Sequence, residues 1–216
     1  MKRMIVGVLA LGLGACAQQT LGGELPVTLG GGGALYPLLS ADAAGVVCPP
    51  AGWSRDELIA AKAAGFEIAD NEKRQAFARA ITACLASSDP ALRDGVAYEA
   101  LTHMLRGRQL SSQTMKALMA DLVARLDAPA GQGFEQPFAA LALSEVARAD
   151  RIEAFLTEDE LIKLLVDAQH WFINVSDYRG YDEREGWRHG VAHGADLLMQ
   201  LALNPRIDAE GLRVIV

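Results

Sequence analysis

Signals for the start of a helix recur along the chain and constrain its fold more than any other feature. Ser54 stands three residues before Glu57, which is the spacing of a capping box. Thr157 has the same relation to Glu160, and the dipeptide Asp89-Pro90 is a further start signal. Leu and Ala, which favour helices, dominate the sequence, whereas β-branched residues are sparse. We therefore expect an all-α fold.

The expected helices form antiparallel pairs that begin near residues 54, 90, 135 and 187. This spacing is close to that of HEAT or armadillo units, in which neighbouring pairs share a continuous core. We therefore favour an irregular HEAT/armadillo-like helical repeat over the alternative, a compact orthogonal bundle. No segment predicts a sheet. Individual helices are expected to begin near residues 54, 70, 89, 111, 136, 157, 187 and 208.

Residues 1–15 have the pattern of a secretory signal peptide. Lys2 and Arg3 precede an apolar run that is shorter than the roughly 20 residues of a membrane span. The sequence Leu-Gly-Ala-Cys that ends at Cys16 resembles the lipobox of bacterial lipoproteins. The resemblance implies cleavage before Cys16 and a lipid, such as palmitate, on this residue. Because residue 17 is Ala rather than Asp, it also implies the outer membrane, facing the periplasm.

The mature chain is expected to consist of a tether and one domain. Residues 16–52 form a Gly-rich tether and extended arm, and residues 53–216 form the helical repeat-like domain. The formal net charge is −7, and cleavage makes the chain still more acidic, because it removes the positive charges of Lys2 and Arg3. An acidic surface argues against nucleic acid as a partner. The expected partners are the membrane, through the lipid, and an envelope protein.

Two cysteines remain once Cys16 carries the lipid. Cys48 lies in the extended arm, and Cys84 lies near the end of an expected helix. In an oxidising compartment such a pair often forms a disulfide, which would join the arm to that helix. The alternative is two buried, unpaired thiols. A redox-active pair is disfavoured, because the spacing is unlike that of a C-x-x-C motif.

The candidate site lies between Asp177 and Gln200. If residues 187–202 form one helix, then His189, His193, Asp196 and Gln200 share a sector about 60° wide on an otherwise apolar helix. Two His residues four positions apart can bind a metal such as zinc, with Asp196 as a third ligand. The Glu of the zinc-protease motif is missing. The alternatives are a buried His/Asp network that pins the preceding loop, which we favour, a metal site, and metal-free catalysis or ligand binding.

Four other residues of this segment are supporting candidates. Asp177 and Asp182 offer oxygen ligands in the loop that precedes the expected helix. Arg179 is placed either to recognise a carboxylate or phosphate or to pair with the local acids Asp182 and Glu183. Trp187, at the expected start of the helix, is most simply a packing anchor.

Three segments resemble the bacterial domain-of-unknown-function family 2785. They are Arg93–Leu101, Arg179–Tyr181 and Gly186–Leu198, the last with the pattern G-W-x-H-x-x-A-H-x-A-D. The resemblance extends over about residues 53–216 and implies a helical, HEAT-like fold without an established activity.

Two functions fit these observations. The first is a non-enzymatic, membrane-anchored scaffold that binds a protein or peptide partner at the cell envelope and needs no cofactor. The second is a metal- or small-ligand-binding protein, for example a hydrolase, that uses His189, His193 and Asp196. We favour the scaffold.

Overall fold

The computed structural model describes residues 47–216, so the expected signal peptide, Cys16 and the Gly-rich tether lie outside the described residues. Helices begin where the capping signals predict. The Ser54 and Thr157 side chains each accept a hydrogen bond from the backbone of the Glu three residues later, and each Glu bonds back to the cap. Asp89 caps the helix that opens at Pro90. The expected all-α class is confirmed.

The helices are α1 (Arg55–Ala63), α2 (Asn71–Ala80), α3 (Pro90–Leu92), α4 (Glu99–Arg106), α5 (Ser112–Leu126), α6 (Glu135–Ile152), α7 (Glu158–Ile173), α8 (Gly190–Ala202) and α9 (Ala209–Ile215). A 3-10 segment, η1 (Ile81–Ala86), extends α2, and a π-helical segment, η2 (Arg93–Tyr98), joins α3 to α4. The strands are β1 (Tyr181–Asp182) and β2 (Gly186–Trp187).

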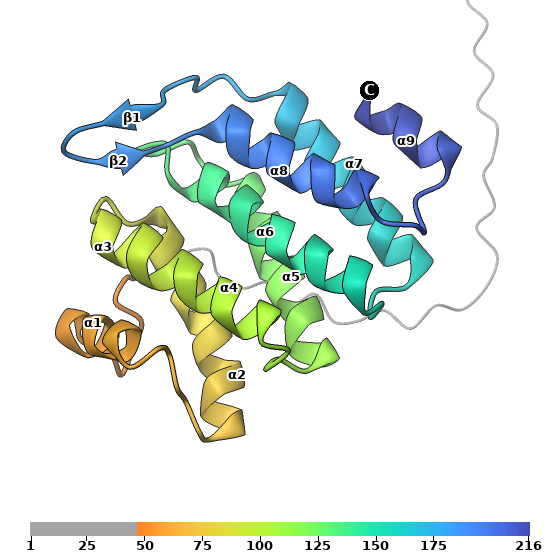
Figure 1. Ribbon diagram of the computed structural model, residues 1–216. Coiled ribbons are helices and arrows are strands. Elements are labelled where there is room, and N and C mark those ends of the chain that lie inside the picture. The colour runs from red at the N-terminus through yellow and green to blue at the C-terminus, as the bar shows by residue number, and fades with distance from the viewer. Residues whose placement is uncertain (1–46) are drawn as a thin grey trace, which may run out of the picture. The chain divides into compact units, whose positions relative to one another are not determined.

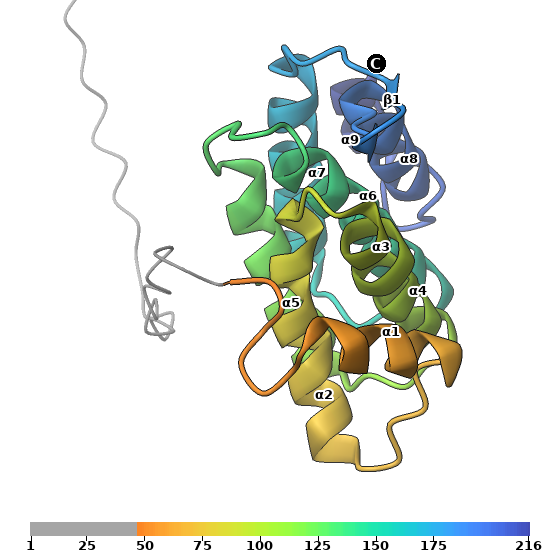
Figure 2. The ribbon, with the colours of Figure 1, turned by 90° about the vertical axis from the view of Figure 1, so that its left-hand side faces the viewer.

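The larger helices lie in two layers, which are seen side by side in Figure 2. One layer holds α4, α6 and α8, and the other holds α2, α5 and α7 (Figures 1 and 2). Successive helices α4 to α8 alternate between the layers, as they would in stacked helix pairs. The two-layer arrangement is therefore clear, and the expected repeat stays a prediction.

Helix α6 forms the centre of the fold, because it packs against α4, α5 and α8. Most of its residues are buried, as expected for a helix that is apolar on nearly every side. Phe134, just before α6, and Phe138, in its first turn, are among the largest fully buried or nearly buried side chains. These two rings underlie the candidate site.

The segment before α8 departs from the expected helix. Residues 181–187 form a short antiparallel hairpin, in which Tyr181 pairs with Trp187. Helix α8 begins at Gly190 and not at Trp187, because His189 has a left-handed backbone with φ 54°. The predictions of a helix over 187–202 and of no strand were wrong here. Within residues 47–216, no helix combines the length and apolar character needed to cross a membrane.

Candidate functional site

The β1–β2 hairpin is a closed, hydrogen-bonded unit that projects beside the start of α8 (Figure 1). One Asp182 oxygen accepts hydrogen bonds from the backbone N–H groups of Arg184, at 2.8 Å, and Glu185, at 3.0 Å, and so holds the turn. These bonds also lower the pKa of Asp182 below its ordinary value. Gly186 follows the turn with φ +76°, a conformation that favours glycine.

Arg93, in η2, attaches the hairpin to the helical body. Its side chain is 0% exposed. One guanidinium nitrogen donates to the carbonyl oxygen of Ser87 at 3.0 Å, and the other terminal nitrogen donates to that of Glu185 at 2.8 Å. The guanidinium carbon lies 4.0 Å from the centroid of the Phe134 ring and 4.8 Å from that of Phe138. A buried cation on two aromatic rings therefore holds the hairpin backbone.

A second arginine, Arg188, reinforces the attachment from the hairpin side. Its Nε donates to the carbonyl oxygen of Gln132 at 2.9 Å, and a terminal nitrogen donates to the Glu185 carboxylate at 2.5 Å. Its guanidinium carbon lies 4.3 Å from the centroid of the Phe134 ring. Phe134 thus contacts two arginines that come from opposite ends of the domain's sequence.

The charge of Arg93 is balanced at close range by Asp94. An Asp94 oxygen lies 2.8 Å from the Arg93 guanidinium. Burial lowers the pKa of Arg93 and raises that of Asp94, in each case because burial disfavours the charged form. Within residues 47–216, neither Arg93 Nε nor this Asp94 oxygen completes a well-formed hydrogen bond. The pair therefore depends on its mutual attraction and is sensitive to loss of either partner.

Arg179 pairs with Asp177 at 2.6 Å, and not with Asp182 or Glu183, the acids expected as its partners. The hydrogen bond from Arg179 is the main reason why the pKa of Asp177 lies below its ordinary value. Arg179 also donates to the Gln132 carbonyl at 3.3 Å. A Cβ at Gly133 would lie 2.4 Å from an Asp177 oxygen, so the loop approaches this pair closely only because residue 133 is glycine.

The expected polar stripe is divided by the start of α8. His189 lies before the helix, and the centroids of its ring and that of His193 are 5.9 Å apart. Asp196 is exposed. Gln200 faces α6, where it accepts a hydrogen bond from Arg151 at 3.3 Å. Across residues 47–216, no three His, Cys, Asp or Glu side chains are grouped so that they could hold a metal ion. The metal-site and hydrolase alternatives stay predictions.

The hairpin instead joins a row of rings that runs from the surface to the core. Trp187 lies 4.9 Å from Tyr181 and 4.0 Å from His189, centroid to centroid. His193 lies 5.1 Å from Phe138 in an edge-to-face arrangement. Trp187 is 44% exposed, so it packs on Tyr181 and His189 without being buried.

His193 is the titratable group most affected by this packing. Its Nδ1 lies 3.2 Å from the Pro137 carbonyl oxygen, which only accepts, so Nδ1 is the protonated nitrogen. Burial lowers the pKa of His193 to about 4 from an unfolded value near 6.5. The unfolded chain therefore binds a proton, and the folded chain does not, between these two pH values.

We expect the free energy of unfolding to fall by about 3 kcal/mol as the pH is lowered from about 6.5 to about 4. In His193→Gln, whose amide can donate to the same carbonyl, this part of the pH dependence should disappear. Urea unfolding of both proteins at several pH values measures it. Equal pH dependence in the two proteins would show that His193 does not titrate between folded and unfolded states.

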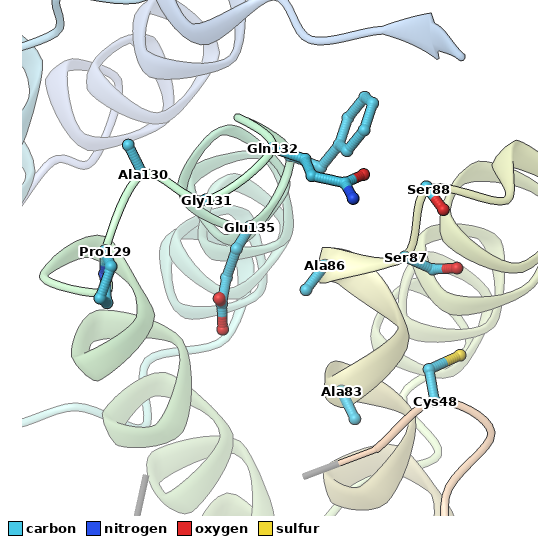
Figure 3. Close-up of a pocket in the computed structure, with 11 residues that line it drawn as sticks. Cys48, Ala83, Ala86, Ser87, Ser88, Pro129, Ala130, Gly131, Gln132 and Glu135 are labelled. Carbon is cyan, nitrogen blue, oxygen red and sulfur yellow. The ribbon is translucent and has the colours of Figure 1, made fainter. Parts of the chain in front are cut away.

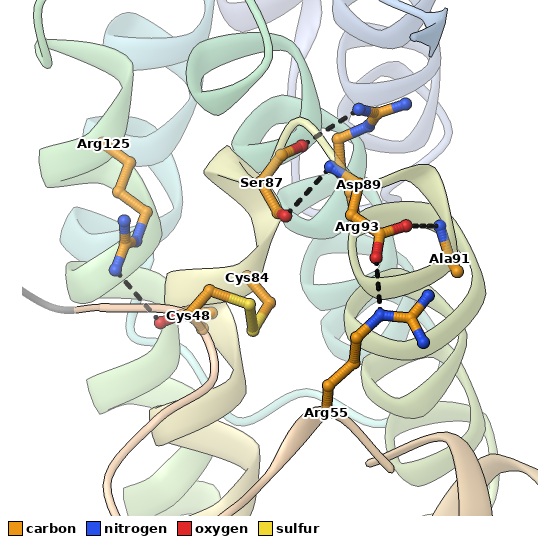
Figure 4. The surroundings of a disulfide bond; sticks show 9 residues. Cys48, Arg55, Cys84, Ser87, Asp89, Ala91, Arg93 and Arg125 are labelled. Atoms are coloured by element: carbon orange, nitrogen blue, oxygen red, sulfur yellow. Dashed lines mark hydrogen bonds and ion pairs between the residues drawn. A yellow bond between two sulfur atoms is a disulfide. The ribbon is translucent and has the colours of Figure 1, made fainter. Parts of the chain in front are cut away.

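Of the two alternatives for Cys48 and Cys84, the structure has the disulfide. Cys48, in the arm, forms a disulfide with Cys84, in η1, across a sequence separation of 36 residues. Cys84 is fully buried. Figure 4 shows this bond beside Ser87, Asp89 and Arg93. The arm is therefore covalently attached to the segment that supports the hairpin anchor.

Residues 122–216 match the model of a family described as "Protein of unknown function (DUF2785)". The resemblance inferred from the sequence is confirmed over this range, and residues 53–121 lie outside the match. No match to the chain is found among curated proteins or among solved structures.

The matched range contains the hairpin, Phe134 and Arg188, whereas Arg93 and the disulfide lie before it. Sequence analysis missed Arg93 and Phe134 as members of the site. The available signal was a single arginine among the apolar residues Leu92, Val96 and Ala97. An ionised side chain within such a pattern is rarely buried unless it is paired.

Proposed function

We propose that the protein is a membrane-anchored helical scaffold that binds a protein or peptide partner through the β1–β2 hairpin. The observation that carries the proposal is the exposure of two large aromatic side chains on a hairpin with a fixed backbone, and of a third, Tyr178, in the segment just before it. Tyr178 is 77% exposed, Tyr181 is 60% exposed and Trp187 is 44% exposed. Tyr and Trp are enriched among the residues that dominate the binding energy of protein interfaces.

The fixed backbone favours recognition, because a surface that is already ordered loses little conformational entropy on binding. The hairpin is held by Arg93 on one side and by Arg188 on the other. Its backbone bonds continue beyond the strands, since Arg188 N–H donates to the Gly180 carbonyl at 3.1 Å. Tyr181 and Trp187 also contact each other, so their relative positions are restricted.

A cross-linking experiment on the full-length protein in the cells that produce it tests the binding surface. A photoreactive benzoyl-phenylalanine is placed at Tyr181 or, as the control, at Lys73, an exposed residue of α2 far from the hairpin (Figure 1). We expect a discrete covalent adduct from position 181 only, and its loss when Trp187→Ala is added. No adduct from position 181, or equal adducts from both positions, would contradict the proposal.

The membrane anchor rests on the lipobox-like sequence that ends at Cys16. In Cys16→Ala, we expect the protein to leave the membrane fraction and the lipid-modified N-terminal peptide to disappear from mass spectra. A mature protein that carries two or more acyl chains should stay with the membrane, because one chain alone gives only marginal binding. Equal membrane association of both proteins would argue against the anchor.

A further inference from the structure

The Cys48–Cys84 disulfide borders a surface groove of about 420 Å³ between η1 and the loop that precedes α6 (Figure 3). Cys48 lines this groove and is partly exposed, whereas Cys84 is 0% exposed. Cys48 is therefore the cysteine of the pair that solvent contacts, and a thiolate arriving from solvent meets it before Cys84. Glu135 also lines the groove, but Arg125 pairs with it at 2.5 Å and offsets the charge that would repel a thiolate.

The disulfide is linked to the hairpin through a short chain of contacts, which Figure 4 shows in part. The Ser87 N–H donates to the Cys84 carbonyl oxygen at 3.1 Å. The Ser87 carbonyl accepts from Arg93 at 3.0 Å, and Arg93 donates to the Glu185 carbonyl at 2.8 Å. A displacement of Cys84 is therefore transmitted to the hairpin through Ser87 and the Arg93 side chain.

Ser87, which directly follows η1, is also positioned by contacts that lead to α1. The Ser87 hydroxyl accepts from the Asp89 N–H at 3.1 Å, and Asp89 pairs with Arg55 of α1 at 2.9 Å. The disulfide is the covalent part of this arrangement, because it joins the arm before α1 to η1. Its cleavage leaves only non-covalent contacts between the arm and η1.

We propose that Cys48 is a site of thiol–disulfide exchange with a dithiol reductant, and that reduction loosens the hairpin. A reductant thiolate attacks the Cys48 sulfur, a bond between these two sulfurs forms, and the Cys48–Cys84 bond breaks. The electron pair leaves on Cys84 as a thiolate, which takes a proton from water. The second thiol of the reductant then displaces the Cys48 thiolate, so the reductant is oxidised by two electrons and the protein is reduced by two.

The consequence of reduction for partner binding rests on the proposed function, whereas the exchange and the loosening do not. The full-length protein is therefore tested without a partner. It is treated with reduced glutathione, quenched with acid and digested, and the mixed disulfide is located by mass spectrometry. We expect glutathione on Cys48 and a free thiol at Cys84, without denaturant. Glutathione on Cys84, or reaction only in denaturant, would overturn the proposed site.

Hydrogen exchange of residues 181–189 measures the loosening. We expect exchange of these amides to rise about threefold or more when dithiothreitol reduces the wild-type protein. Cys48→Ala/Cys84→Ala is the matched control, because dithiothreitol should not change its exchange, which should equal that of the reduced wild type. Unchanged hairpin exchange in the reduced wild type would overturn the coupling, and this measurement needs no variant that folds.

Discussion

Arg93→Met is expected to lower the free energy of unfolding by about 2–5 kcal/mol, because it leaves two carbonyl groups without the donor of a fully buried side chain, at about 1–3 kcal/mol each. The change leaves the Asp94 carboxylate without its close cation, and it removes the donors of the Ser87 and Glu185 carbonyls. It also removes a cation from the faces of two aromatic rings. Urea unfolding, followed by far-UV circular dichroism, measures the loss.

Arg55→Met is the matched control for this prediction. Arg55 also pairs with an aspartate, at 2.9 Å, but its side chain is 52% exposed. Exposed pairs contribute little, so we expect a loss of at most about 1 kcal/mol. If both substitutions lowered the free energy of unfolding by the same amount, the burial of Arg93 would not explain its contribution to stability.

Cys48→Ala/Cys84→Ala is expected to lower the free energy of unfolding by about 4 kcal/mol. The disulfide closes a loop across a separation of 36 residues, and the model of lost loop-closure entropy gives this value for a loop of that length. The native contacts directly after the arm, such as the packing of Trp53 on Phe77 with ring centroids 4.8 Å apart, do not depend on either cysteine and should be retained in the variant. The loss therefore comes mainly from greater freedom of the unfolded chain.

Unfolding of the wild type with and without dithiothreitol provides the internal comparison. The reduced wild type should match the double variant, and dithiothreitol should leave the variant unchanged. A loss below about 1 kcal/mol would show that the arm is held by its packing and that the disulfide adds little constraint.

The prediction of helices from sequence succeeded where the signal is local. The capping residues Ser54, Asp89 and Thr157 each bond to backbone within three residues, so a short pattern contains the whole interaction. The apolar spacing likewise placed α7 at residues 158–173. The apolar pattern also predicted that Trp187 and His189 lie on a helix, and this was wrong, because α8 begins at Gly190.

The local pattern of caps and apolar residues determined the helices and the all-α class, because these interactions join residues that are neighbours in sequence. Only the tertiary structure decided that residues 181–187 form a hairpin with exposed aromatic side chains. The contact that holds it, from Arg93 to the Glu185 carbonyl, joins residues 92 positions apart. No local pattern contains such a contact, since it forms only when η2, Phe134 and the hairpin are brought together by packing.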